Sequence, residues 1–170
     1  MKKSLQPTVL ALLAGAATSQ AVLIEVRVET TGPVGLAPGL AAFSDGSFDV
    51  FDPGSMASSA LETLAETGAP SDFAPPAGGA VFGPGIGPGS PPIFAPGASA
   101  TAIFDVPANF SSFNFASMLL PSNDWFIGNG TGLDISSLLG GSVTSLSFDF
   151  STVWDAGTEL EDFDFSPGNG

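Results

Sequence analysis

Alternating apolar and polar side chains form the clearest pattern in this chain. In residues 22–31 the side chains of Ile24, Val26 and Val28 alternate with charged ones, which predicts a half-buried strand. Similar patterns predict strands over four further ranges: 100–106, 113–120, 124–128 and 142–151. The expected inward side chains are Phe113, Phe115, Ser117 and Leu119 in one of them, and Leu146, Phe148 and Phe150 in another. Many short strands separated by turn residues favour a mostly β fold, an antiparallel β-sandwich.

One segment has the features of a helix. Ser55 is positioned to cap a short helix over residues 56–66, with Leu61 and Leu64 on its inner side and Gly68 just beyond its end. Elsewhere, Asp45-Gly46 predicts a turn, and residues 133–141 predict a helical turn or a loop.

Residues 69–99 are rich in glycine and proline, so regular structure is not expected through much of this range. An interdomain linker and a long surface loop both fit this composition. We favour the loop, because the strands on either side are too few to build two separate cores. The expected organisation is therefore a single domain over residues 22–170.

The first residues have the pattern of a secretory signal peptide. Lys2 and Lys3 precede a short apolar run, and Ser19-Gln20-Ala21 follows as a cleavage site with small residues at its first and last positions. The run is too short to span a membrane comfortably, and a buried N-terminal helix is the alternative. We therefore expect residues 1–21 to be removed and the remainder to be secreted, into either the extracellular space or a periplasm.

Export would leave Arg27 as the only cation against 17 acidic residues, a net charge of −16. Such a surface repels nucleic acid and attracts cations, although acidity also serves solubility alone. The chain has no Cys and no His, which excludes disulfides, thiolate zinc sites and His-based catalytic triads. Oxygen atoms are the remaining metal ligands, and they suit calcium or magnesium.

Two segments resemble the signature of the spondin domain, the N-terminal module of F-spondin and mindin-type matrix proteins, which also occurs in secreted bacterial proteins. These segments are Pro-Ser-Asn-Asp-Trp-Phe at 121–126 and Trp-Asp-Ala-Gly-Thr-Glu at 154–159. The upstream stretches LAPGLAAFSDGSFDVFDPGSMAS and LETLAETG are also similar to the bacterial members. The resemblance thus covers most of the chain after residue 21.

This resemblance implies a C2-like β-sandwich that binds one calcium ion at a loop end. The ligand positions of the family correspond to Asp124, Asp155 and Glu159 in this sequence. Glu159 departs from the family pattern, which has Asp there, and its longer side chain changes the geometry of the site. Calcium binds six to eight oxygens in flexible geometry, so three carboxylates would be completed by carbonyls and water.

Each of these residues also has a simpler interpretation. Asp124 follows Asn123 and suits a plain turn, while Asp155 and Glu159 suit a solvated edge of an acidic protein. Trp125 and Trp154 are expected as core anchors rather than as a platform for sugars.

Three functions follow as hypotheses. The leading one is a non-enzymatic, calcium-binding, monomeric module that binds an extracellular protein or glycan at the cell surface or in the matrix, without nucleic acid and without a membrane span. Paired carboxylates would also suit a secreted glycoside hydrolase. A structural matrix or biofilm component without any ion is the third.

Overall fold

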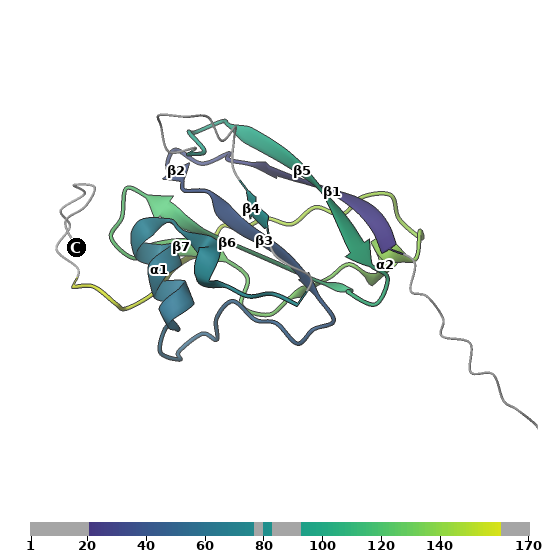
Figure 1. Ribbon diagram of the computed structural model, residues 1–170. Coiled ribbons are helices and arrows are strands. Elements are labelled where there is room, and N and C mark those ends of the chain that lie inside the picture. The colour runs from purple at the N-terminus through teal and green to yellow at the C-terminus, as the bar shows by residue number, and fades with distance from the viewer. Residues whose placement is uncertain (1–20, 77–79, 83–92, 161–170) are drawn as a thin grey trace, which may run out of the picture.

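The computed structural model describes residues 21–76, 80–82 and 93–160, and Figure 1 shows their arrangement. The predicted signal peptide lies outside the described residues. The strands are β1 (Ala21–Glu29), β2 (Gly35–Leu36), β3 (Gly39–Ser44), β4 (Ala80–Phe82), β5 (Ser99–Pro107), β6 (Ser112–Leu120), β7 (Trp125–Gly128), β8 (Leu133–Asp134) and β9 (Val153–Asp155). The helices are α1 (Ser59–Thr67), the 3₁₀ turn η1 (Pro70–Asp72) and α2 (Ser136–Leu139).

The strands form two antiparallel sheets. β1 and β5 pair along their full length, from Ala21 opposite Pro107 to Glu29 opposite Ser99. The larger sheet has the order β4-β3-β6-β7-β9, and the short strands β2 and β8 also pair with β6. Every strand pairing is antiparallel, so the predicted antiparallel, sandwich-like, mostly β fold is confirmed.

The large sheet is covered on both faces, which gives the molecule two apolar clusters. Between the sheets, Ile24 of β1 packs with Phe43 of β3 and with Phe113 and Phe115 of β6. The rings of Phe43 and Phe113 are centred 5.1 Å apart. On the opposite face, α1 buries Leu61 and Leu64 against the sheet, in the same cluster as Phe126 of β7. β6 is therefore buried on both sides, which explains why Asn114 and Ser117 are fully buried with the apolar residues.

The helix begins three residues later than the sequence predicted. Ser58, not Ser55, is the N-cap, and its side chain accepts a hydrogen bond from the backbone N–H of Leu61. Ser55 instead closes a turn, its N–H donating to the carbonyl of Asp52 at 3.0 Å. Gly54 has a φ of +84° in this turn, so the chain cannot enter a helix there. At the other end, the predicted stop at Gly68 is confirmed by its left-handed conformation.

The Gly/Pro-rich range 69–99 has more structure than a surface loop. It contains η1 and β4, which pairs with β3. Phe94 forms a bridge with Leu36 and is completely buried in the cluster between the sheets. Residues 77–79 and 83–92 of this range lie outside the described residues.

The predicted strand over residues 142–151 is wrong. Only β9, which begins at Val153, forms a strand in this part of the chain. Leu146 and Phe148 are 36 % and 38 % exposed, while Phe150 reaches Phe115 at a ring-centroid distance of 5.3 Å. Alternation alone does not make a strand, because the backbone also needs a neighbour at hydrogen-bonding distance.

Candidate functional site at the loop end of the large sheet

The two signature segments meet because β7 and β9 are antiparallel neighbours. Trp125, the first residue of β7, lies opposite Asp155, the last residue of β9. Asp124 immediately precedes β7, so both carboxylates lie at the same end of the sheet. The N–H of Ala156 donates to the carbonyl of Asp124 at 3.1 Å, which extends the pairing by one step.

Asp124 is almost completely buried, with 1 % of its surface exposed. Its Oδ2 atom accepts two backbone hydrogen bonds, from the N–H of Thr158 at 3.1 Å and of Glu159 at 3.2 Å. Consecutive N–H groups turned toward one oxygen form a cradle for an anion. Asp124 thus fastens the segment after β9 to the turn before β7.

Gly157 makes this cradle possible. Its φ is +67°, a conformation that a residue with a side chain adopts only at a cost. The turn is further fixed by the N–H of Gly157, which donates to Oδ1 of Asp155 at 2.7 Å. The glycine between the two acidic residues therefore directs the chain back toward Asp124.

The electrostatics of Asp124 are set by burial and by its acidic neighbour. Burial raises the pKa of the Asp124 carboxyl above its usual value of 3.8, and the charge of Asp155 raises it further. The N–H donors of Glu159 and Thr158 act in the opposite direction, since they stabilise the carboxylate. The net result is a pKa of Asp124 above its usual value, with burial of the carboxyl as the largest cause.

The structure brings two of the three predicted ligands together. Asp124 and Asp155 lie side by side at the end of the β7–β9 pair, close enough for the charge of Asp155 to raise the pKa of Asp124. Glu159 meets Asp124 through its backbone N–H, and no hydrogen bond of its carboxylate is found within the described residues. Across the same part of the chain, no three acidic side chains are gathered closely enough to form a ready metal cluster.

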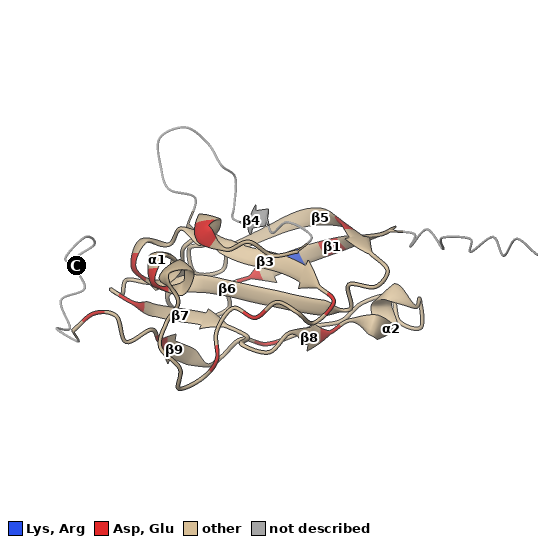
Figure 2. Ribbon diagram, turned by 60° about the horizontal axis from the view of Figure 1, so that its bottom comes forward, with Lys and Arg blue, Asp and Glu red and all other residues tan. Residues whose placement is uncertain are grey.

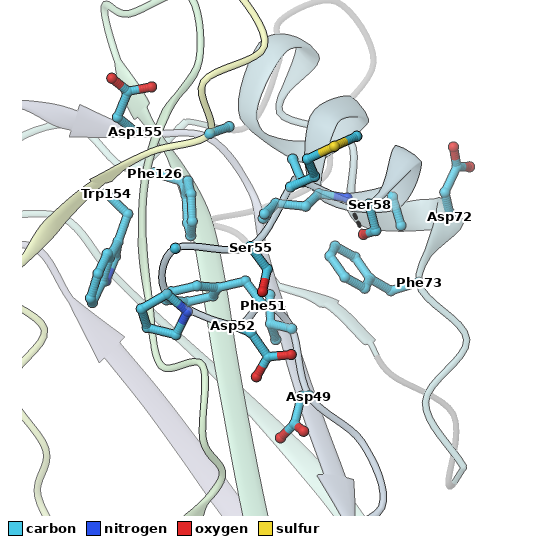
Figure 3. Close-up of a pocket in the computed structure, with 18 of the residues that line it drawn as sticks. Asp49, Phe51, Asp52, Ser55, Ser58, Asp72, Phe73, Phe126, Trp154 and Asp155 are labelled. Carbon is cyan, nitrogen blue, oxygen red and sulfur yellow. Dashed lines mark hydrogen bonds between the residues drawn. The ribbon is translucent and has the colours of Figure 1, made fainter.

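A hollow of about 380 Å³ is lined in part by Asp155, and the sequence analysis did not predict it. Figure 3 shows it between the 49–58 segment, the start of α1 and the end of β9. The rings of Phe51, Phe126 and Trp154 form one wall. The centroid of the Phe51 ring lies 5.0 Å from that of Phe126 and 4.9 Å from that of Trp154. Phe73 contributes to the lining from beyond α1.

The hollow is acidic as well as aromatic. Asp49, Asp52, Asp72 and Asp155 line it, and all four are exposed. The lining contains no basic residue. The signal that could have revealed this site is the coupling of Asp to Phe in FDVFDPGS and SDF, where each aromatic anchor carries a carboxylate beside it.

The distribution of charge agrees with this local picture. Figure 2 shows acidic residues spread over strands and loops, with one basic position on β1. That position is Arg27, whose guanidinium lies 3.0 Å from Glu29 in an exposed pair. Because Arg27 is the one cation among the described residues, the carboxylates at the loop end have no basic partner there.

A family model described as Spondin_N matches residues 37–167, which includes the turn before β7 and the segment after β9. The chain belongs to the Spondin_N family. No curated protein matches the chain.

This membership supports an extracellular module of a typically non-catalytic type. Within the described part of this Spondin_N chain, no helix is long and apolar enough to cross a membrane.

Proposed function

We propose that this Spondin_N chain is a secreted, non-enzymatic module that binds calcium beside Asp124 and Asp155 and presents the adjoining hollow to an extracellular partner. The observation that carries the proposal is the pairing of β7 with β9, which brings the buried Asp124 and the exposed Asp155 to the same end of the sheet without a basic residue beside them. Within the described residues, the one ion pair is Arg27–Glu29 on β1.

The donor set fits a hard cation. Calcium prefers carboxylate and carbonyl oxygens as ligands. The side chains of Asp124 and Asp155 both supply carboxylate oxygens. Oδ2 of Asp124 already accepts two N–H groups and Oδ1 of Asp155 accepts one, so Oδ1 of Asp124 and Oδ2 of Asp155 are the oxygens offered to the ion. Glu159 is two residues beyond Gly157, where its side chain is a third donor if it turns toward the pair.

When bound, calcium supplies positive charge that offsets the repulsion between the two carboxylates. The residues of the chain hold the two carboxylates in place. Asp124 holds the backbone of Thr158 and Glu159, and Gly157 sets the turn that keeps Asp155 beside it. The ion would therefore stabilise the same loop junction that already forms one wall of the hollow.

Partner binding is assigned to the hollow because it combines exposed charge with apolar surface. A wall of buried and half-buried aromatic rings surrounded by solvated carboxylates has the composition of a binding site rather than of a plain solvated face. The carboxylates favour a partner that presents positive charge.

Hydrolysis of glycans is not supported by this geometry. A retaining or inverting hydrolase needs two carboxyl groups that both reach the substrate. Asp124 is the carboxyl with the raised pKa, and its 1 % exposure keeps it away from any glycan outside the protein.

Calorimetric titration of the metal-free protein with calcium tests the proposal. We expect one saturable site, with binding lost in Asp155→Asn and kept in Asp45→Asn. Asp45 is a matched control, because it is an exposed aspartate whose Oδ1 accepts a local N–H, here that of Ser47. Equal heats for the protein and for Asp155→Asn would refute calcium binding at this pair and would favour an ion-free structural role.

A further inference from the structure

A second hollow lies between the two sheets and is much larger, about 910 Å³. Its floor is apolar and includes Phe113, Phe115 and Ile127. Its two long borders are the consecutive residues 24–32, mostly from β1, and 146–151. Successive residues of a strand point to opposite faces, so a hollow that touches all of them lies along the edge of the strand.

The edge of β1 that borders this hollow has no strand partner among the described residues. β5 pairs with all nine residues of β1 along the other edge, and no other described strand pairs with it. An unpaired edge exposes backbone donors and acceptors, and proteins usually cover or disrupt such edges.

The opposite border is equally unpaired. We call residues 144–151 the strap. No backbone hydrogen bond joins the strap to any other described residue. Its sequence nevertheless alternates as a strand does, and Leu146 and Phe148 remain more than a third exposed. Only Phe150 reaches the core, against Phe115.

The direction of the strap can be established from its neighbours. The strap follows α2 and Ser142, whose hydroxyl donates to the carbonyl of Ser137. Just before α2, the N–H of Ile135 donates to Ser111, at the start of β6. After the strap, Val153 lies opposite Ile127, which in turn lies opposite Ser117 further along β6. The strap therefore runs in the same direction as β6.

β1 runs in this direction too. Ile24, early in β1, lies opposite Phe104, whose ring is 5.2 Å from that of Phe43. Phe43 is paired with Phe113, near the start of β6. Further along the chain, Leu36 is paired with Leu119, near the end of β6. The chain thus advances along β6 from Ile24 to Leu36, parallel to the strap.

We propose that the strap docks onto the free edge of β1 as a third, parallel strand of the small sheet. This goes beyond the proposed function, because it involves neither calcium nor the acidic hollow. Docking pairs two backbone segments that are both unpaired in the open form. It also moves Leu146 and Phe148 onto the apolar floor and fills the hollow. The open form presents a strand edge and an apolar cavity, and the closed form removes both.

Hydrogen exchange measured by mass spectrometry on the unmodified protein tests this directly. We expect the amides of the strap to exchange at least about 100-fold more slowly than in an unfolded peptide, because pairing protects them in the closed form. Exchange at the unfolded rate would overturn the proposal. Saturable binding of an apolar dye in that case would show that a foreign ligand fills the hollow instead.

A pair of substitutions provides the second test. Phe148→Ser would lower the folding equilibrium constant about 100-fold if the ring is buried in the closed form, as for other buried phenyl rings. Leu23→Ser is the matched control, since Leu23 is 74 % exposed on the outer face of β1 and should change the constant less than about threefold. Equal small effects of the two substitutions would contradict docking, even if the strap amides were protected.

Discussion

Replacing Asp124 by alanine and by asparagine should have opposite consequences in the absence of calcium. Alanine removes the acceptor of the Thr158 and Glu159 N–H groups, which are held at 3.1 and 3.2 Å. An orphaned donor that is only partly buried costs about 1–2 kcal/mol, so Asp124→Ala should destabilise the protein by about 2–4 kcal/mol. Asparagine keeps a carbonyl oxygen for both donors and places an amide toward Asp155. Asp124→Asn should therefore change stability by less than about 1 kcal/mol, or increase it.

The assay is urea unfolding in a chelator at neutral pH, followed by tryptophan fluorescence. Trp125 is next to Asp124 in the chain, and Trp154 contacts Phe51, so both report on this end of the molecule. Added calcium should then stabilise the unmodified protein but neither variant. A loss in Asp124→Asn as large as in Asp124→Ala would refute the cradle as the role of this residue, because charge rather than hydrogen bonding would then be decisive.

Three further predictions concern the same region and the helix. In chelator, protonation of the Asp124 carboxyl should add stability that is fully present below pH 3.8 and lost as the pH rises through its raised pKa in the folded protein, while the hydrogen bonds to its Oδ2 persist at neutral pH; Asp124→Asn should remove this pH-dependent component from unfolding curves measured across pH. Gly157→Ala should cost about 1 kcal/mol in thermal unfolding, because its φ of +67° is unfavourable for alanine although the added Cβ meets no atom within 4 Å. Ser58→Ala should lose about 1 kcal/mol of stability with the N-cap, whereas Ser55→Ala should lose much less, and the reverse order would contradict the observed helix start.

The sequence predicted those features whose cause is local. β1 alternates because one face lies on the core, and its inward residues Ile24, Val26 and Val28 all belong to the cluster between the sheets. Gly68 ends α1 because the left-handed cap needs no Cβ. The meeting of Asp124 and Asp155 was expected only from the family resemblance, and it results from the long-range pairing of β7 with β9.

The errors arose where tertiary contacts decide between local alternatives. Ser55 and Ser58 are both good N-caps, and the turn through Gly54 selects the second. Phe94 lies in a stretch whose composition predicts a loop, yet its ring is completely buried in the core. The range 142–151 alternates as well as β1 does, but within the described residues no strand pairs with it, and its backbone hydrogen bonds are those of Ser142 and Val143 to Ser137. No local signal distinguishes a strand from an extended segment beside a cavity.

The Asp–Phe pairs of the acidic hollow are visible in the sequence, but that they gather around one hollow could not be predicted from it, for a similar reason. Asp49 and Asp52 come from the segment after β3, Asp72 comes from η1, and Asp155 comes from β9. Their shared position follows from α1 packing on the large sheet, which no spacing in the sequence encodes.

The central claim, that Asp124 and Asp155 together bind calcium, is tested most directly by a crystal structure grown with calcium and analysed for anomalous scattering. We predict a single strong peak within coordination distance of both carboxylates, at about 2.3–2.6 Å from their oxygens. A calcium-saturated crystal with no peak beside Asp124 and Asp155, or with its peak elsewhere on the acidic surface, would contradict the account.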